Sequence, residues 1–169
     1  MWRNPRLVVL LLAGSLTVMA GGVIAPILPA LISDLNIDPS VGSSLVSLHF
    51  LTVALSTPIL GVLADRYSAL FILMVSLVAF AGFGVAGGWM QSLLPLMILR
   101  GGLGVASGGI AAAGLGLLTR LYSGERRTQA IAYVASTLTL ANIIYPLLGG
   151  WLGSIHWRLA FAAYGISIP

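Results

Sequence analysis

The sequence predicts an all-α polytopic membrane protein with five complete transmembrane helices and the start of a sixth. Long stretches without charge are the first observation: no Asp, Glu, Lys or Arg lies between Arg6 and Asp34, or between Arg66 and Arg100. A helix needs ~20 apolar residues to cross the hydrocarbon core of a bilayer, and these stretches exceed that length. Composition is the second observation, with 59% hydrophobic and 7% charged residues and a mean hydropathy of +1.06. Lipid is therefore the solvent of this chain, and no sizeable soluble domain is expected.

The expected helices cover residues 7–32, 40–64, 68–88, 93–119 and 129–153, followed by an incomplete span over 156–169. The second helix is expected to start at Asp38-Pro39-Ser40, because Pro is favoured in a first helical turn. Gly87-Gly88-Trp89 ends the third helix, and Ser123-Gly124 breaks the chain after the fourth. The last segment would reach only about 20 Å, which is too short to cross. The sequence therefore predicts one truncated helix bundle over residues 1–169.

The basic residues predict the orientation of the bundle. They are Arg3 and Arg6 before the first span, Arg66 after the second, and Arg120, Arg126 and Arg127 after the fourth, whereas Asp34, Asp38 and Arg158 belong to the opposite loops. Basic residues near span ends mark the cytoplasmic side. We expect a cytoplasmic amino terminus, a cytoplasmic loop 119–129 and an external loop 33–39 in a bacterial inner membrane. A secretory signal cleaved after Val18-Met19-Ala20 is the alternative for the first span.

Composition also narrows the chemistry. The chain has no cysteine, which excludes disulfides and thiolate metal sites. No cluster of metal ligands, phosphate-binding loop or paired buried carboxylates is evident, so no metal or cofactor is expected. The net charge of +4 is explained by the orientation of the spans, and nucleic acid is not expected as a partner.

Arg100 is the most costly residue in the predicted spans, since it lies about 10 Å into the fourth helix. An Arg at the bilayer centre costs ~2.5–3.5 kcal/mol on insertion scales. It either extends to the outer headgroups or faces a polar cavity. His49 lies near mid-membrane and either relays protons or bonds to a backbone carbonyl. Asn142 is a candidate hydrogen-bonding group of a cavity.

Small residues and prolines predict close packing and bends. Gly104 and Gly108 lie near one face of the fourth helix and would permit tight packing. Pro146 removes a backbone donor from the fifth helix, and Gly149 and Gly150 follow it, so a bend or a simple packing kink is expected there. In the first helix, Pro26-x-x-Pro29 is expected either to unwind the helix near a binding site or to mark the end of the span.

Three motifs carry a resemblance to a known family. Gly61-Val62-Leu63-Ala64-Asp65-Arg66 looks like the signature loop of the major facilitator superfamily, whose twelve-helix secondary transporters are built from two six-helix halves. This chain has Ser68-Ala69-Leu70 where the family continues with Gly and basic residues. Leu96-x-x-x-Arg100-x-x-Leu103-Gly104-x-Ala106-Ser107-Gly108 resembles the fourth-helix motif of its proton-coupled drug and metabolite exporters. Residues 141–150 resemble the antiporter motif, with Tyr145 in place of a glycine.

The resemblance implies the amino-terminal half of such a transporter, with its carboxy-terminal half missing, and alternating access for a small-molecule substrate. In this interpretation Gly61, Asp65 and Arg66 belong to a gate, and Arg100, His49 and Asn142 serve proton coupling or substrate binding. The similar segments Pro58-Ile59-Leu60-Gly61 and Pro146-Leu147-Leu148-Gly149 fit a three-plus-three inverted repeat. Two other readings stay open: a non-transporting membrane protein or assembly partner, and a rhomboid-type intramembrane serine protease using Ser107 with His49 or His156.

Overall fold

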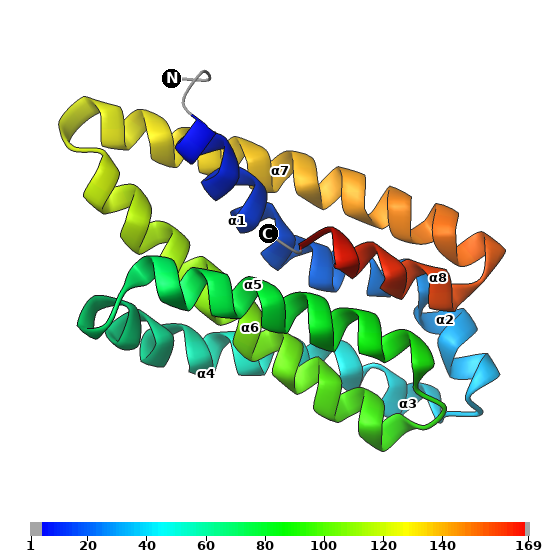
Figure 1. Ribbon diagram of the computed structural model, residues 1–169. Helices are drawn as coiled ribbons and strands as arrows, with labels where there is room; N and C mark the ends of the chain where they lie inside the picture. Colours follow the sequence, from blue (N-terminus) through cyan, green and yellow to red (C-terminus); the bar gives the residue numbers. More distant parts are fainter. Residues whose placement is uncertain (1–4, 168–169) are drawn as a thin grey trace.

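The computed structural model describes residues 5–167, so Arg3 and the last two residues lie outside the described part of the chain. The helices are α1 (Pro5–Gly22), α2 (Ile24–Asp34), α3 (Pro39–Gly42), α4 (Ser44–Arg66), α5 (Ala69–Ala86), α6 (Leu93–Leu121), α7 (Gly124–Ile155) and α8 (Trp157–Ala162), with the 3-10 turns η1 (Gly87–Trp89) and η2 (Ala163–Ser167) (Figure 1). No strand occurs among residues 5–167.

Five segments within residues 5–167 are long and apolar enough to cross a membrane: Pro5–Asp34, Pro39–Arg66, Ala69–Trp89, Leu93–Leu121 and Gly124–Ile155. α8 and η2 form the start of a sixth span. The fifth helix begins at Gly124 rather than at the expected residue 129, so the expected loop 119–129 shrinks to Tyr122 and Ser123. A helix satisfies its own backbone hydrogen bonds and can continue into the headgroup region with charged residues on it.

The first span is interrupted at Val23, between α1 and α2. Pro26 explains the place of this break. Proline has no N–H to offer to the carbonyl four residues earlier, and its ring clashes with that carbonyl, which here belongs to Gly22. Pro29 lies inside α2, where the helix continues around it. The break therefore lies one turn before the Pro26-x-x-Pro29 pair.

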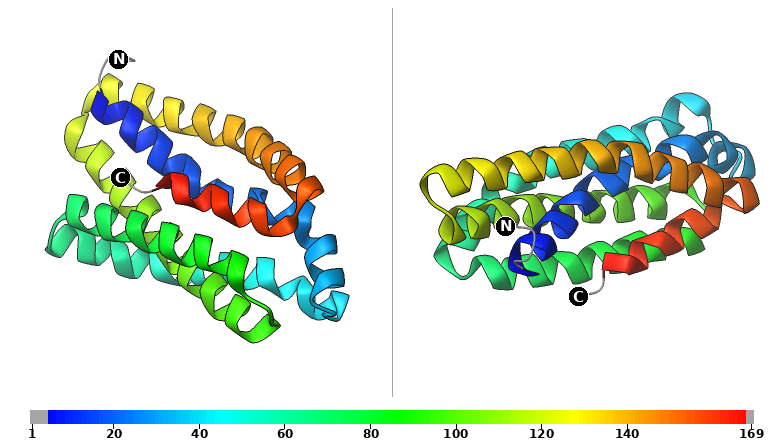
Figure 2. Two further views of the ribbon diagram at one scale, coloured as in Figure 1. Left: turned by 45° about the vertical axis from the view of Figure 1, so that its right-hand side comes forward. Right: turned by 90° about the horizontal axis from the view of Figure 1, so that it is seen from above.

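The spans pack in a pattern that fits two inverted triplets. α4 lies against α6, α1 lies against α7, and η2 lies along α5. An inverted repeat relates the first, second and third spans to the fourth, fifth and sixth. It converts the contact between the second and fourth spans (α4 and α6) into the contact between the fifth and first spans (α7 and α1). The contact between the third and sixth spans (α5 and η2) is converted into itself. Figures 1 and 2 show the α1–α7 pair on one side and α4, α5 and α6 on the other, with α8 between α1 and α5.

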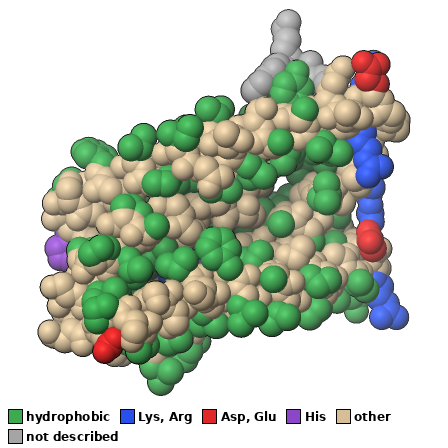
Figure 3. Space-filling view, turned by 180° about the vertical axis from the view of Figure 1, so that it is seen from behind, with side chains coloured by type: hydrophobic (Ala, Val, Ile, Leu, Met, Phe, Trp, Pro, Cys, Tyr) green, Lys and Arg blue, Asp and Glu red, His purple; other side chains and the backbone are tan. Residues whose placement is uncertain are grey.

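Charge is segregated along the bundle axis. Arginine side chains gather at one end of the face drawn in Figure 3, the end where α1 and α7 begin and α4 and α6 finish. Asp34 and Asp38 lie at the opposite end. Asp38 caps α3, and its carboxylate accepts hydrogen bonds from the Ser40 hydroxyl and from the Ser40 N–H at 2.8 Å. These hydrogen bonds hold the pKa of Asp38 below its usual value.

Glycines on α6 bring its backbone close to α4 and α5. A Cβ atom on Gly104 would overlap Thr52 Oγ1 and would lie 2.6 Å from the His49 carbonyl oxygen. One on Gly108 would overlap Ser56 Oγ. On the adjoining side of α6, one on Gly109 would overlap Ser76 Oγ of α5. Lipid supplies no hydrophobic driving force for helix association, so close packing of this kind holds the helices together instead.

We expect Gly104→Ala to lower the free energy of unfolding by about 1–3 kcal/mol, because the added methyl group overpacks the α4–α6 contact against backbone. Gly114→Ala is the matched control on the same helix, since nothing lies within 4 Å of its Cβ position. That substitution should be neutral or stabilising, because alanine is the better helix former. Thermal unfolding of the purified protein in detergent measures both. Equal effects of the two variants would contradict the packing role of Gly104.

Candidate functional site

Arg100 is held inside the bundle between three spans. Its side chain extends from α6 and is only 2% exposed. Nη1 donates a hydrogen bond to the carbonyl oxygen of Ala20, at 2.9 Å, and a longer one to the Tyr164 hydroxyl oxygen, at 3.4 Å. The guanidinium carbon lies 5.3 Å from the centre of the Phe161 ring. Arg100 therefore does not extend to the outer headgroups, one of the two alternatives for it.

No carboxylate of this chain can neutralise Arg100 within the membrane. The sequence has four acidic residues, at positions 34, 38, 65 and 125, and all lie at helix ends. The positive charge is met instead by the Ala20 carbonyl dipole and by aromatic faces. A desolvated cation–π contact contributes about 2 kcal/mol, comparable with the ~2.5–3.5 kcal/mol insertion cost. Nη2 is buried and has no hydrogen-bond partner among residues 5–167.

His49 lies beside this group on α4 and is 1% exposed. Neither ring nitrogen makes a hydrogen bond of ordinary geometry within the described part of the chain, but the ring lies against the backbone of Arg100, so a bond to a backbone carbonyl stays open as its alternative. The ring lies within electrostatic reach of the Arg100 charge. Buried polar nitrogens without partners are rare in proteins, and a functional role is one of the explanations for them. The two His49 ring nitrogens and Arg100 Nη2 are the buried side-chain nitrogens of the described residues that lack a hydrogen bond of ordinary geometry.

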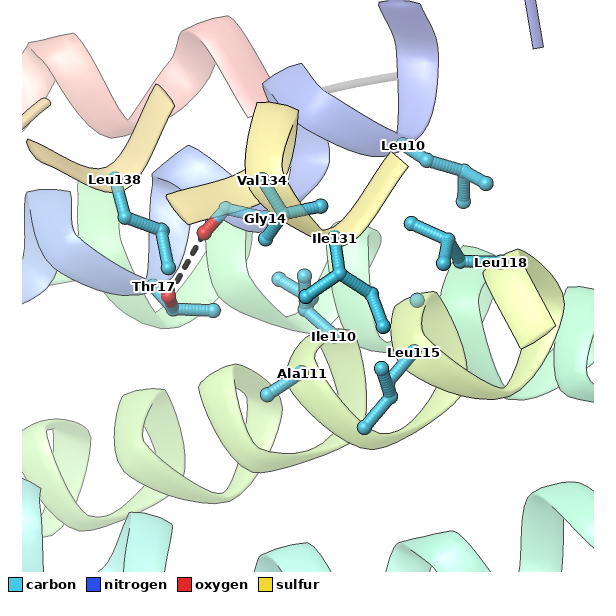
Figure 4. A pocket seen from close by; sticks show the side chains of 11 residues that line it. Leu10, Gly14, Thr17, Ile110, Ala111, Leu115, Leu118, Ile131, Val134 and Leu138 are labelled. Carbon is cyan, nitrogen blue, oxygen red and sulfur yellow. Dashed lines mark hydrogen bonds between the residues drawn. The ribbon is translucent and has the colours of Figure 1, made fainter. Parts of the chain in front are cut away.

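An apolar groove runs along one face of the bundle, between α1 and α7 on one side and α6 and α4 on the other. It consists of two adjoining hollows of about 230 and 480 Å³ that share Thr17 and Ala111. Figure 4 shows the smaller hollow, where the Thr17 hydroxyl donates to the Gly14 carbonyl oxygen at 2.8 Å. His49 and Asn142 line the larger one.

Asn142 is exposed at the edge of this groove, and its Nδ2 donates to the Leu138 carbonyl oxygen of its own helix at 2.9 Å. That bond uses the amide nitrogen and does not involve the amide oxygen. Arg100 is not among the residues that line either hollow. Its charge is separated from the groove by the α1–α2 junction.

The last turn of α4, which continues through the expected turn to Arg66, forms an ion pair with the end of α6. Arg120 Nη2 donates to Asp65 Oδ1 at 3.0 Å, and the side chains are 53% and 79% exposed. Gly61, one turn earlier, faces α6 at Ala112. Arg66 is exposed and does not take part in this ion pair. The sequence singled out Asp65 and Arg66 but not Arg120, whose only signal was its position in the last turn of the fourth span.

The part of α7 around Pro146 packs against the break of the first span. Gly22 faces Tyr145 and Pro146, and a Cβ on Gly149 would lie 2.6 Å from the Val23 carbonyl oxygen. Gly150 faces Pro26 at ordinary contact distance. Ser15 and Tyr145 share a hydrogen bond of 2.9 Å between their hydroxyl groups. Tyr145, which departs from the antiporter motif, thus has a defined partner on α1.

The protease reading finds no geometric support among residues 5–167. The Ser107 hydroxyl is fully buried and donates to the Leu103 carbonyl oxygen of its own helix at 2.9 Å. No hydrogen bond joins it to His49 or His156 in that part of the chain. His156 lies at the outer end, where its ring accepts the Arg158 N–H. The described residues also contain no group of three His, Cys, Asp or Glu that could hold a metal ion.

Comparison with known proteins identifies the family. The family model of the Major Facilitator Superfamily matches residues 10–168, and the chain belongs to this superfamily of transporters. It is 31% identical over 150 residues to the multidrug efflux protein YfmO of Bacillus subtilis (strain 168), covering 89% of this chain and 37% of that protein. It is 30% identical over 172 residues to the class H tetracycline resistance protein of Pasteurella multocida, covering 98% and 42%.

The fold also matches a solved structure. A bacterial homologue of the human lysosomal transporter Spinster, in an inward-facing and occupied conformation, superposes with a TM-score of 0.86 at 21% identity. The match covers 96% of this chain and 41% of that one, as expected for half of a twelve-helix fold. The chain is thus an integral membrane protein that spans about two fifths of the length of these relatives, 37% and 42% for the two named above.

The exposed Asp65–Arg120 ion pair should contribute little to stability. A double-mutant cycle with Asp65→Asn and Arg120→Gln should give a coupling free energy of about 0.2–1 kcal/mol, because both groups remain solvated. The coupling should fall as salt is raised. Arg66→Gln in place of Arg120→Gln is the control and should couple more weakly to Asp65→Asn. A coupling above about 2 kcal/mol would assign the pair a structural role that its exposure does not support.

Proposed function

We propose that this chain is the amino-terminal half of a secondary active transporter, a proton-coupled efflux antiporter of small molecules that works by alternating access. The groove between α1, α4, α6 and α7 carries the proposal. Its lining is almost entirely apolar, with Thr17, His49 and Asn142 as polar groups, which suits a lipophilic molecule with few hydrogen-bonding atoms. The relatives' names, multidrug efflux protein and tetracycline resistance protein, support export.

The proposal assigns roles to two buried polar side chains, His49 in the lining of the groove and Arg100 behind it. His49 is the one residue of the spans described here whose ordinary pKa lies near neutrality, so it is the candidate proton carrier. Arg100 is the residue that senses the charge of protonated His49. Its side chain is bonded to Ala20, beside the α1–α2 junction that lines the groove. Protonation of His49 would place two positive charges close together in a low-dielectric medium, which favours a different helix arrangement.

The remaining candidates belong to the moving parts. Gly61, Asp65 and Arg66 belong to the gate at the end of α4, and the Asp65–Arg120 ion pair connects that end to α6. Pro146, Gly149 and Gly150 form a bend that rests on the break of the first span, so α1 and α7 would move as one unit. Gly104 and Gly108 hold α6 to α4 as the opposite unit. A second six-helix half is the partner that would cover the groove.

Transport is tested in inside-out vesicles that contain this chain together with a second six-helix half. With an imposed proton gradient, vesicles should accumulate tetracycline in a saturable manner, and Arg100→Ala should abolish accumulation without loss of expression. Arg127→Gln is the control, since it removes an exposed arginine from the first turn of α7, at the end of the bundle and far along the helix from the groove residue Asn142. Retained transport in the Arg100 variant would remove this residue from the mechanism.

Proteoliposomes with the 169-residue chain alone should show no saturable, gradient-driven flux, because the groove lacks its second wall. Flux from the chain alone would contradict the assignment as half of a transporter. Binding without flux, in the presence of a second half, would instead favour a non-transporting membrane protein.

The amino terminus is proposed to be cytoplasmic in a bacterial plasma membrane, because the arginines gather at that end of the bundle. Alkaline phosphatase fused at Asn36, between α2 and α3, should be active, and the same enzyme fused at Glu125 should be inactive. Fluorescent protein fusions should give the opposite pattern. An active phosphatase at Glu125 would invert the proposed topology.

A further inference from the structure

Two aromatic side chains of the sixth span pack against two glycines at the end of the third span. Phe161 and Tyr164 are three residues apart and 2% and 0% exposed. Gly84 of α5 and Gly87, which follows α5 as the first residue of η1, have the same spacing. A Cβ on Gly84 would lie 2.5 Å from Tyr164 Cγ, and one on Gly87 would lie 2.5 Å from Phe161 Cε1. No larger residue fits at either position, so both rings have a defined place against α5.

Both rings are directed toward Arg100. The guanidinium carbon lies 5.3 Å from the Phe161 ring centre and 5.8 Å from the Tyr164 ring centre, within the range of cation–π attraction. The Tyr164 hydroxyl donates to the Ala20 carbonyl oxygen at 3.1 Å, the same oxygen that accepts Arg100 Nη1 at 2.9 Å. One carbonyl next to the break in the first span is thus bonded by the fourth and sixth spans together.

We propose that Phe161 and Tyr164 are positioning residues for Arg100. Their ring faces stabilise the guanidinium charge, because the chain supplies no carboxylate there. They also keep Nη1 hydrogen-bonded to the Ala20 carbonyl oxygen, so that Nη2 is the nitrogen of Arg100 left without a described partner. An acidic partner would neutralise Arg100 and occupy both nitrogens, whereas aromatic faces stabilise the cation and leave one donor for another group. The consequence for transport rests on the proposed function of Arg100; the positioning itself does not.

Phe80 offers a matched control for packing alone. It is fully buried on α5, and its ring centre lies 5.5 Å from that of Tyr164. The cation–π contacts of Arg100 are with Phe161 and Tyr164 and not with Phe80. Phe80→Leu therefore loosens the same aromatic cluster without removing a face from the guanidinium.

The test measures how fast the arginine-specific reagent phenylglyoxal modifies Arg100 in the purified 169-residue chain, read by peptide mass spectrometry. In the unsubstituted chain Arg100 should stay protected while the exposed Arg127 reacts. Phe161→Leu and Tyr164→Leu should each raise the Arg100 rate about tenfold, the order expected when a desolvated cation–π contact is lost. Phe161→Tyr, which keeps a ring, should restore protection. Phe80→Leu should leave the rate near that of the unsubstituted chain.

Tyr164→Phe keeps the ring and removes only the hydroxyl bond to Ala20, so it should fold and raise the rate by a smaller factor. Thermal unfolding identifies any variant that does not fold, and Tyr164→Phe and Phe161→Tyr then carry the comparison. The proposal would be overturned if phenylglyoxal modified Arg100 at the same rate in Phe80→Leu and Phe161→Leu. It would also be overturned if neither Tyr164→Phe nor the leucine variants changed that rate. The readout needs no transport, so it succeeds or fails independently of the antiporter assignment.

Discussion

The close approach of α6 to its neighbours is the contact on which the rest of the structure depends. Lipid chains are as apolar as leucine, so helices in a bilayer gain little from hiding apolar surface and associate through backbone proximity instead. Gly104 and Gly108 give α4 that proximity, and Gly109 gives it to α5. The first span contacts α6 less extensively and relies on α7, where Gly149 lies on the Val23 backbone. The bundle is thus two tightly packed units with a groove between them.

Arg100 connects these units. It extends from α6 and reaches across to Ala20 of the first span, next to the place where Pro26 interrupts the helix. A buried cation needs acceptors, and the Ala20 carbonyl supplies one to Arg100 on the turn before the break. The aromatic rings of the sixth span add the remaining stabilisation without a carboxylate. The arrangement places a permanent charge at the centre of the bundle, whereas the other charged residues between positions 5 and 167 lie near helix ends.

Much of the fold could be predicted because its determinants are local. Hydropathy over a window of about 20 residues finds a membrane span whatever its neighbours are. The five spans and the gathering of arginines at one end follow directly. Helix ends were predicted less well: α7 extends back to Gly124 because charged residues at a headgroup do not end a helix, and the break in the first span falls at Val23 rather than at the prolines. The polarity of the residues does not determine the residue at which a helix begins or breaks.

The candidate site was predicted unevenly for the same reason. Arg100 and His49 were visible because a polar residue in an apolar run is unusual wherever it points. Phe161, Tyr164 and Arg120 were not visible, because an aromatic residue in a span or an arginine at its end is ordinary until its partner is known. Ser15 and Tyr145 belong to the same class, since 130 residues separate them along the chain.

The sequence by itself determined the solvent of this protein, the number of its spans and their alternating direction, because these depend on the free energy of transferring each segment into lipid. Only the tertiary structure decided which faces of the helices meet, that Arg100 points inward to Ala20 and the aromatic pair, and where the groove opens. Those choices depend on shape complementarity between segments far apart in the chain, and hydropathy carries no information about shape.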